Sequence, residues 1–185
     1  MALLPSLLTL LGAGEAVALT DGSESADVSA AEQASWRNVT AHAERFSAQF
    51  PARPEFRSVT QHTIVGDVTQ TGYRARFGDG FFSVELHELP GIAEFFAPAN
   101  LVLERAKNQI LKESDTVPLS FARVETEGHP GSVFSYRSDK SNFEIEEVRL
   151  VLVGKRLFKL TAGLVKGSDD RSAMDRFFNS FRFWK

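Results

Sequence analysis

Histidine is the side chain best suited to acid–base chemistry or metal binding, and this sequence has four, at positions 42, 62, 87 and 129. The nearest groupings of possible ligands are His87 with Glu88 and His42 with Glu44. A zinc site needs three or four converging ligands, and the sequence contains neither an HExxH motif nor an HxH pair. We therefore expect surface histidines, and predict neither a metal site nor a cofactor.

Nucleophilic catalysis would require a serine on a strained turn beside a histidine, and neither GxSxG nor SxxK occurs. The segment Gly78-Asp79-Gly80 does not suit a phosphate, because it places an acidic side chain where the anion would bind and precedes a strand pattern. The chain has no cysteine, which excludes thiolate chemistry and disulfides. We predict no catalytic residues; a hydrolase whose site is assembled from distant residues stays open as an alternative.

Glu144, Glu146 and Glu147, near Asp139, are the remaining group with possible chemistry. Glu144 and Glu146 alternate onto one face of a predicted strand, where they could form an acidic face or a weak Ca²⁺ site. The sequence supplies no EF-hand loop around them. We interpret them as the solvated side of a strand.

Composition indicates a globular domain that does not bind nucleic acid. Hydrophobic residues make up 43% and charged residues 24% of the chain, as in ordinary folded domains. The net charge of -3 lacks the basic character that phosphate neutralisation requires. Sixteen Phe against two Trp and two Tyr predict a dry aromatic core.

The N-terminal segment predicts export. Residues 1–18 are apolar at first and end in Ala16-Val17-Ala18, a small-x-small pattern typical of a signal-peptide cleavage site. No Lys or Arg precedes the apolar run, so a docking helix or an interface extension stays open, and the run is too short to span a membrane. Residues 19–35 predict an acidic flexible linker, and residues 36–185 a single domain. The expected location is periplasmic or secreted, with cytoplasmic as the alternative.

Alternating apolar residues predict most of the domain to be strands. Two short strands flank a bend at residues 42–45. A three-stranded meander follows from Phe56 to Leu89, with turns at Gly66-Asp67 and Gly78-Asp79-Gly80, and the charged face of its last strand should contact water. A further pair, Leu119–Thr126 and Ser132–Arg137, is joined by a loop over residues 127–131.

The longest alternating run, Phe143 to Leu164, predicts a β-hairpin on which the fold is organised. A three-residue loop at Gly154-Lys155-Arg156 would place Leu150 opposite Leu160 and give one wholly apolar face. A two-residue Gly-Lys loop would instead place Arg149 opposite Leu160. We prefer the three-residue loop because it separates apolar from polar faces.

Two helices are predicted to pack on these strands. The first runs from Pro98 to about Glu113, with an apolar stripe and an outer side that includes Lys107. The second is capped by Ser168, and Met174, Phe177, Phe178 and Phe181 line its core face. Strands joined by tight turns, with few crossovers, indicate an α+β fold: a mostly antiparallel sheet with two main helices packed on it.

Several short segments resemble the PsbP-like superfamily. They are Trp36, the Phe46–Pro51 segment FSAQFP, the turn GHPG at 128–131, RLFKL at 156–160 and FNSF at 178–181. That superfamily includes photosystem II extrinsic subunits, DcrB-type bacterial envelope proteins, Mog-type Ran-binding import factors and Eag-type chaperones. The resemblance implies a PsbP-like fold over about Trp36 to Trp184 and a non-enzymatic binding or assembly function.

The expected function is therefore an exported binding or assembly domain that acts through protein–protein contacts with an unknown protein partner. Adjacent Phe95 and Phe96 precede the first helix and are the candidate partner-binding residues; a hydrophobic staple into the core is the competing interpretation. A chaperone that shields an apolar client helix, as Eag-type proteins do, is the first alternative. A hydrolase with a dispersed active site is the second. A homodimer is possible, and no stable membrane span is expected in the mature chain.

Overall fold

Strands dominate the part of the chain that the computed structural model describes, which comprises residues 36–63, 66–78, 80–89, 98–139, 143–165 and 171–184. The strands are β1 (Arg37–Ala41), β2 (Phe46–Phe50), β3 (Glu55–Thr63), β4 (Gly66–Phe77), β5 (Gly80–Glu88), β6 (Pro118–Thr126), β7 (His129–Tyr136), β8 (Phe143–Val153), β9 (Arg156–Val165) and β10 (Arg182–Phe183). The helices are α2 (Ala99–Glu113) and α3 (Ser172–Ser180).

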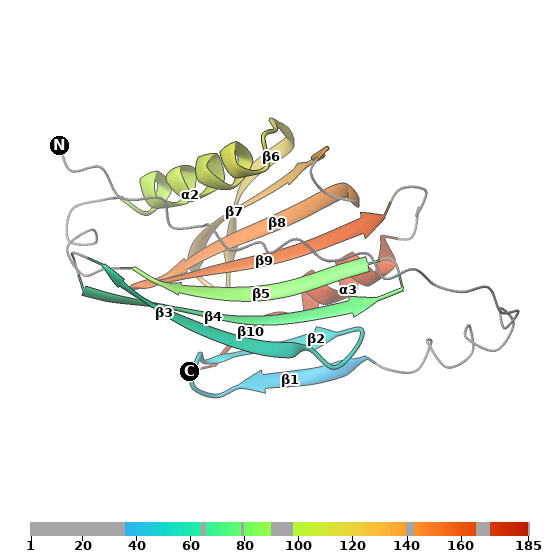
Figure 1. Cartoon of the computed structure of the whole chain (residues 1–185), viewed down its shortest axis with the longest axis horizontal. Coiled ribbons are helices and arrows are strands. Elements are labelled where there is room, and N and C mark those ends of the chain that lie inside the picture. The colour runs from blue at the N-terminus through green and yellow to red at the C-terminus, as the bar shows by residue number, and fades with distance from the viewer. Residues whose placement is uncertain are drawn as a thin grey trace, which may run out of the picture.

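The strands form two antiparallel sheets (Figure 1). The larger sheet has seven strands in the order β3-β4-β5-β9-β8-β7-β6, and the smaller has three in the order β1-β2-β10. Helix α2 lies along β7 and β8 on one face of the larger sheet, whereas α3 packs on β2 and β9. The α+β prediction, with a mostly antiparallel arrangement and two helices packed on it, is confirmed. None of the described helices is long and apolar enough to cross a membrane.

Two hydrophobic clusters cover opposite faces of the larger sheet. The main cluster lies between the two sheets and α3, and includes Phe46, Phe82, Phe158 and Phe177. The second lies between α2 and the sheet and includes Leu103, Phe134 and Leu150. Strands β8 and β9 contribute to both clusters, so the middle of the sheet is covered on both sides.

Phenylalanine rings hold the main cluster together, as the composition predicts. Phe46 stacks on Phe181 at 5.5 Å between ring centroids and meets Phe158 edge-on at 6.1 Å. Phe177 meets both Phe50 and Phe82 edge-on. These rings are almost fully buried and link β2, β5, β9 and α3, so burial of aromatic surface fixes the small sheet onto the large one.

The register of the central hairpin differs from the prediction. Val153 pairs with Arg156, and Arg149 lies opposite Leu160, so the loop has two residues. Gly154 has a φ of 56°, as the first loop position of a type II′ turn requires. The prediction was wrong because it assumed one apolar face and one wet face. Both faces of this hairpin are covered by core, and apolar residues are therefore needed on each.

Two other turns also differ from the predicted positions. Gly66 pairs with Thr63 and Asp67 pairs with His62, so these two residues belong to β4 and not to the predicted turn. Thr126 pairs with His129, so the turn between β6 and β7 is the two-residue loop at Glu127 and Gly128, not a five-residue loop. Both loop residues have positive φ values, 50° and 82°, as a type I′ turn requires.

The helices follow the predicted stripes with one exception. Met174, Phe177, Phe178 and Phe181 are buried as predicted, whereas the predicted cap Ser168 lies outside the described residues. Lys107 of α2 was predicted on the outer side, but its side chain is buried. Its ammonium donates to Glu104 and lies 4.2 Å from the centre of the Phe121 ring, which explains how the charge is accommodated.

Candidate functional site

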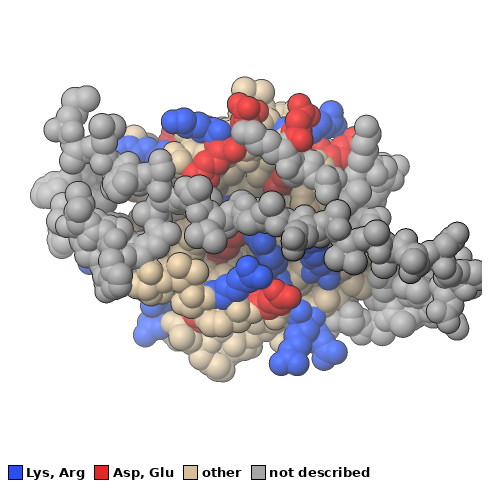
Figure 2. All heavy atoms as spheres, viewed as in Figure 1, with Lys and Arg blue, Asp and Glu red and all other residues tan. Residues whose placement is uncertain are grey.

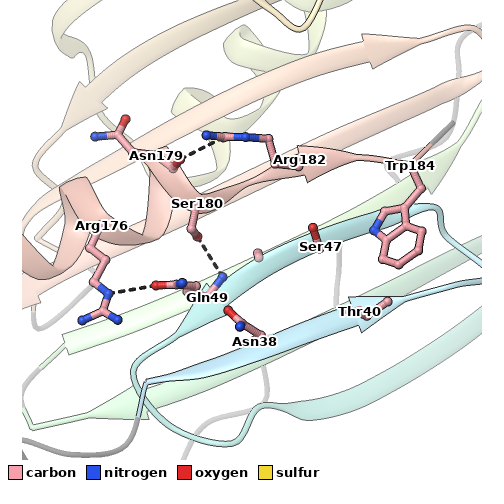
Figure 3. A pocket seen from close by; sticks show the side chains of 10 residues that line it. Asn38, Thr40, Ser47, Gln49, Arg176, Asn179, Ser180, Arg182 and Trp184 are labelled. Carbon is pink, nitrogen blue, oxygen red and sulfur yellow. Dashed lines mark hydrogen bonds between the residues drawn. The ribbon is translucent and has the colours of Figure 1, made fainter.

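A groove of about 620 Å³ lies on the small sheet. Its walls come from four elements: Asn38 and Thr40 of β1, Ser47, Ala48 and Gln49 of β2, Arg176, Asn179 and Ser180 of α3, and Arg182 and Trp184 at the C-terminal strand (Figure 3). Alternation places Ser47 and Gln49 outward, because Phe46, Ala48 and Phe50 of β2 point into the core. Amide, hydroxyl and guanidinium groups therefore line the groove.

Strand pairing aligns the polar side chains in rows. Asn38 lies opposite Gln49, and Thr40 lies opposite Ser47, which in turn lies opposite Arg182. Ser180 ties the helix to this sheet, because its hydroxyl accepts a hydrogen bond from the Gln49 N–H at 2.8 Å and donates to the Phe177 carbonyl. The groove is thus built on regular elements of the fold, which fix its side chains better than a loop would.

The two arginines of the groove differ in what they contact. Arg176 Nε donates to Gln49 Oε1 at 2.9 Å, and its guanidinium carbon lies 4.4 Å from the centre of the Trp36 ring. Arg182 instead donates from Nη1 to the carbonyls of Asn179 and Phe181, and its Nε lies 3.6 Å from a carboxylate oxygen of Glu127. Arg182 therefore caps the end of α3 and has an acidic partner.

A second notable surface is the free edge of the larger sheet at β6. Val117, directly before β6, is 73% exposed, and Leu119 and Phe121 of β6 are 57% and 43% exposed; we call these three residues the apolar β6 edge. Strand β6 pairs with β7 on one side only. The opposite edge, β3, also exposes two large apolar residues, Phe56 and Val59.

Three ionisable side chains, Glu85, His87 and Lys159, meet on the face of β5 and β9 that points away from the main cluster. Glu85 accepts a hydrogen bond from Lys159 Nζ at 3.1 Å and lies 3.7 Å from His87 Nε2. Burial by itself would raise the pKa of Glu85, but the Lys159 ammonium and the His87 imidazole hold that pKa well below its ordinary value. The prediction that this face of β5 contacts water was wrong, since Ser83, Glu85 and His87 are largely covered.

This cluster lacks the geometry of a hydrolytic triad. The Ser83 hydroxyl is buried and has no hydrogen-bond partner among the described residues, and Glu85 stands between Ser83 and His87 along the strand. Two residues of a strand span about 6.6 Å, so a serine and a histidine four positions apart are beyond hydrogen-bond reach. The cluster is consistent with a buried ion pair that orders the sheet.

Both tyrosines of the chain donate to carboxylates. Tyr73 donates to Glu44 at 3.2 Å, and burial followed by the Glu44 charge raises the pKa of Tyr73 to about 12. Tyr136 donates to Glu146 at 2.9 Å, and burial followed by the Glu146 charge raises the pKa of Tyr136 well above its ordinary value. These phenols are neutral at physiological pH and act as hydrogen-bond donors.

The predicted acidic group does not converge on one point. Glu144 pairs with Arg137, whereas Glu147 pairs with Arg171 at 3.0 Å and lies 3.6 Å from Arg149. With Glu146 bonded to Tyr136, each glutamate has its own partner. Among the described residues, no three His, Asp or Glu side chains come together as metal ligands.

The candidate partner-binding residues Phe95 and Phe96 lie outside the described residues. The histidines are dispersed: His42 contacts Trp184 edge-on, His129 contacts Phe183, and His87 lies beside Glu85. Sequence reasoning did not single out Arg176 or the groove. Its only signal was the outward alternation of Asn38, Thr40, Ser47 and Gln49 on two short strands, and the pairing partner of those strands was unknown.

Acidic and basic side chains are interspersed on the described part of the face that Figure 2 shows. On this face, the charges of the described residues do not form one extended field of a single sign.

Comparisons with known proteins identify the fold. A scan against models of protein families finds no match, and a search of curated proteins finds none either. Among solved structures, the chain is similar to cyanobacterial PsbP (CyanoP) from Synechocystis sp. PCC 6803, with 15% identity, a TM-score of 0.55, and coverage of 94% of this chain and 99% of that one. A protein from Bacteroides thetaiotaomicron also matches, with 13% identity, a TM-score of 0.34, and coverage of 80% of this chain and 48% of that one. The fold is PsbP-like, as the sequence resemblance implied.

Proposed function

We propose, on the premise of this PsbP-like fold, that the chain is a non-enzymatic accessory domain which binds a protein partner along the apolar β6 edge. The observation that carries the proposal is the exposure of Val117, Leu119 and Phe121 at one free edge of the seven-stranded sheet. The sequence resemblance supports it, since it implies binding or assembly proteins and not enzymes.

An edge strand presents unpaired backbone N–H and C=O groups, and proteins commonly shield such an edge with charges or a covering element. Pro118 and the register shift between Pro118 and Ser120 shield only the start of β6, and no charged residue follows until Arg123. An extended segment of a partner can pair with this stretch of β6, with its backbone supplying hydrogen bonds and its apolar side chains packing on Leu119 and Phe121. The occupant we propose is such a strand.

The location of the exposed apolar residues distinguishes this mode from a chaperone that cradles a helix. Phe56, Val59, Leu119 and Phe121 stand on the two edge strands, whereas no large apolar residue is exposed in the described part of the middle strands. A helix cradle requires an apolar sheet face or groove. The Eag-type alternative is therefore less well supported than strand addition.

A pull-down from the native host with matched variants tests the proposal. Leu119→Ser/Phe121→Ser changes the β6 edge, and Phe56→Ser/Val59→Ser changes the β3 edge with residues of similar exposure. We expect the partner to be captured by the wild type and the β3 variant and lost from the β6 variant. Phe95→Ala/Phe96→Ala is the third variant, because those residues stay predicted partner contacts.

The mode of binding is then checked with the purified partner. Pairing along β6 should slow amide hydrogen exchange over Pro118–Thr126 in the complex, and leave exchange in β3 unchanged. Undiminished capture by a β6 variant that melts at the wild-type temperature would overturn the proposal. So would protection confined to β3.

We further propose that the domain is exported and that residues 1–18 are removed, leaving a mature chain that begins in the acidic segment 19–35. The support is the small-x-small end of the apolar N-terminal run. Mass spectrometry of the protein from its native host tests this. A soluble cytosolic chain that still begins at Met1 would contradict it.

A further inference from the structure

We propose that the groove on the small sheet binds a carboxylate of a peptide, and that Arg176 is the residue that recognises it. This site is separate from the β6 edge, which belongs to the larger sheet. The groove's volume of about 620 Å³ lies in the range typical of small-ligand sites. Its open polar walls suit an extended chain end or an acidic side chain.

The charge of the groove is positive and incompletely compensated. Its ten lining residues include two arginines and no acidic residue. Glu127 lies beside Arg182, but no carboxylate of the described residues pairs with Arg176. One guanidinium charge is therefore available, which matches a single carboxylate better than a polyanion such as nucleic acid.

Arg176 is also held in place before any ligand binds. Its Nε bond to Gln49 and its position over the Trp36 ring fix the plane of the guanidinium. Figure 3 shows this guanidinium at one end of the polar row and Trp184 toward the other. Within the described residues, its two Nη groups make no hydrogen bond, so they are the donors left for a ligand. A fixed fork loses less entropy on binding than a free side chain, and it matches the two oxygens of a carboxylate.

The rest of the groove is compatible with an anion. The C-terminal end of a helix normally presents bare carbonyls that repel negative charge. Here Ser180 donates to the Phe177 carbonyl, and Arg182 donates to the Asn179 and Phe181 carbonyls. Side-chain donors of Asn38, Ser47 and Asn179 lie in the same wall and can bind the backbone of the peptide that carries the carboxylate.

Tryptophan fluorescence of the full chain gives a direct assay, because its two tryptophans are Trp36 below Arg176 and Trp184 in the groove wall. The probes are three acetylated tripeptides. Tri-glutamate amide presents side-chain carboxylates, tri-glutamine with a free C-terminus presents one terminal carboxylate, and tri-glutamine amide presents none. We expect saturable changes with one or both carboxylate peptides, weakened by added salt, and none with the amide control.

Variants then assign the contact. Arg176→Gln should weaken binding of the carboxylate peptide at least tenfold, since a charge-assisted hydrogen-bonded pair is lost. Arg176→Lys keeps the positive charge but lacks the two parallel guanidinium donors. Its affinity for the carboxylate peptide should lie between those of Arg176→Gln and the wild type. Arg123→Gln on β6 is the matched control, which should bind the peptide as the wild type does while leaving the groove intact.

The outcomes separate this inference from the proposed function. Equal binding of all three peptides, no saturable binding at all, or wild-type affinity in a folded Arg176→Gln variant would each overturn the carboxylate site. None of these results bears on capture at the β6 edge. If both proposals hold, the Leu119→Ser/Phe121→Ser variant should lose the partner and still bind the carboxylate peptide in the groove as the wild type does.

Discussion

The carboxylate of Glu85 lies 3.1 Å from the ammonium of Lys159, although the two residues are 74 positions apart in the chain. They face each other across β5 and β9, near the middle of the seven-stranded sheet. Both side chains are more than four-fifths covered. A paired charge in such a place is tolerated, whereas an unpaired one is costly.

Glu85→Gln should therefore destabilise the protein by about 3 kcal/mol, because it leaves the Lys159 ammonium covered and without its partner. Urea unfolding at pH 7 measures the effect. Glu55→Gln is the control, since Glu55 pairs with Arg57 at 3.6 Å on the exposed strand β3. That exposed pair should contribute no resolvable stability, and a similar loss in both variants would contradict the role assigned to Glu85.

The same ion pair predicts the direction of acid sensitivity. The pKa of Glu85 is lower in the folded state than in the unfolded state, so its contribution is fully present above the ordinary carboxyl pKa. That contribution declines as the pH falls below about 4 toward the depressed folded value. Unfolding free energies measured from pH 7 to pH 2 should fall less steeply in Glu85→Gln than in the wild type. Parallel curves would be inconsistent with the pair.

Tyr73 predicts the opposite limit of the pH range. Its pKa is raised to about 12 by burial and by the Glu44 carboxylate, so folding favours the neutral phenol. Stability should be constant below the unfolded pKa of about 10 and decline as the pH rises from there to about 12. Tyr73→Phe should reduce this loss of stability at alkaline pH. The part of the loss that comes from Tyr136 should remain in the variant. Thermal melts between pH 8 and pH 12 decide whether the slope changes.

The fold class could be predicted because the alternation of apolar residues and the tight turns are set by residues that are close in sequence. The helix from Pro98 to Glu113 and the buried stripe from Met174 to Phe181 need only the helical period. The register of the hairpin at Gly154 could not be derived in the same way. It depends on α2 and α3 covering opposite faces of the sheet, which is tertiary information.

The candidate site was less accessible to sequence reasoning for a related reason. Arg176 lies near Gln49 because α3 packs on β2, a contact across 127 positions. The buried pair of Glu85 and Lys159 likewise depends on the order of strands, since β5 neighbours β9 and not β6. A single sequence gives each strand's alternation but not which strand lies beside it.

Phe177 should be among the most costly residues to truncate. Its ring is fully buried and contacts Phe50, Phe82 and Phe178 between the two sheets. Phe177→Ala removes these contacts and leaves a cavity, which should lower the free energy of unfolding by about 3–5 kcal/mol. Phe56→Ala, at an exposed position, should cost far less and serves as the control. Equal effects in chemical denaturation would show that the rings of the main cluster do not carry the packing of the small sheet.

Gly131 gives the sharpest test of strand packing. Gly131 is not among the glycines with positive φ, which include Gly128 and Gly154. The reason for glycine is space, since a Cβ at this position would lie 2.6 Å from the Leu150 carbonyl oxygen. A backbone atom cannot yield as a flexible side chain does, so Gly131→Ala should force β7 away from β8 and cost about 2 kcal/mol.

Gly72→Ala is the matched control within the same sheet, because its Cβ would meet only the Glu85 side chain at an ordinary 3.7 Å. Urea unfolding should therefore separate the two variants by more than about 1 kcal/mol, and an unchanged midpoint for Gly131→Ala would mean that β7 and β8 are not paired as the structure has them.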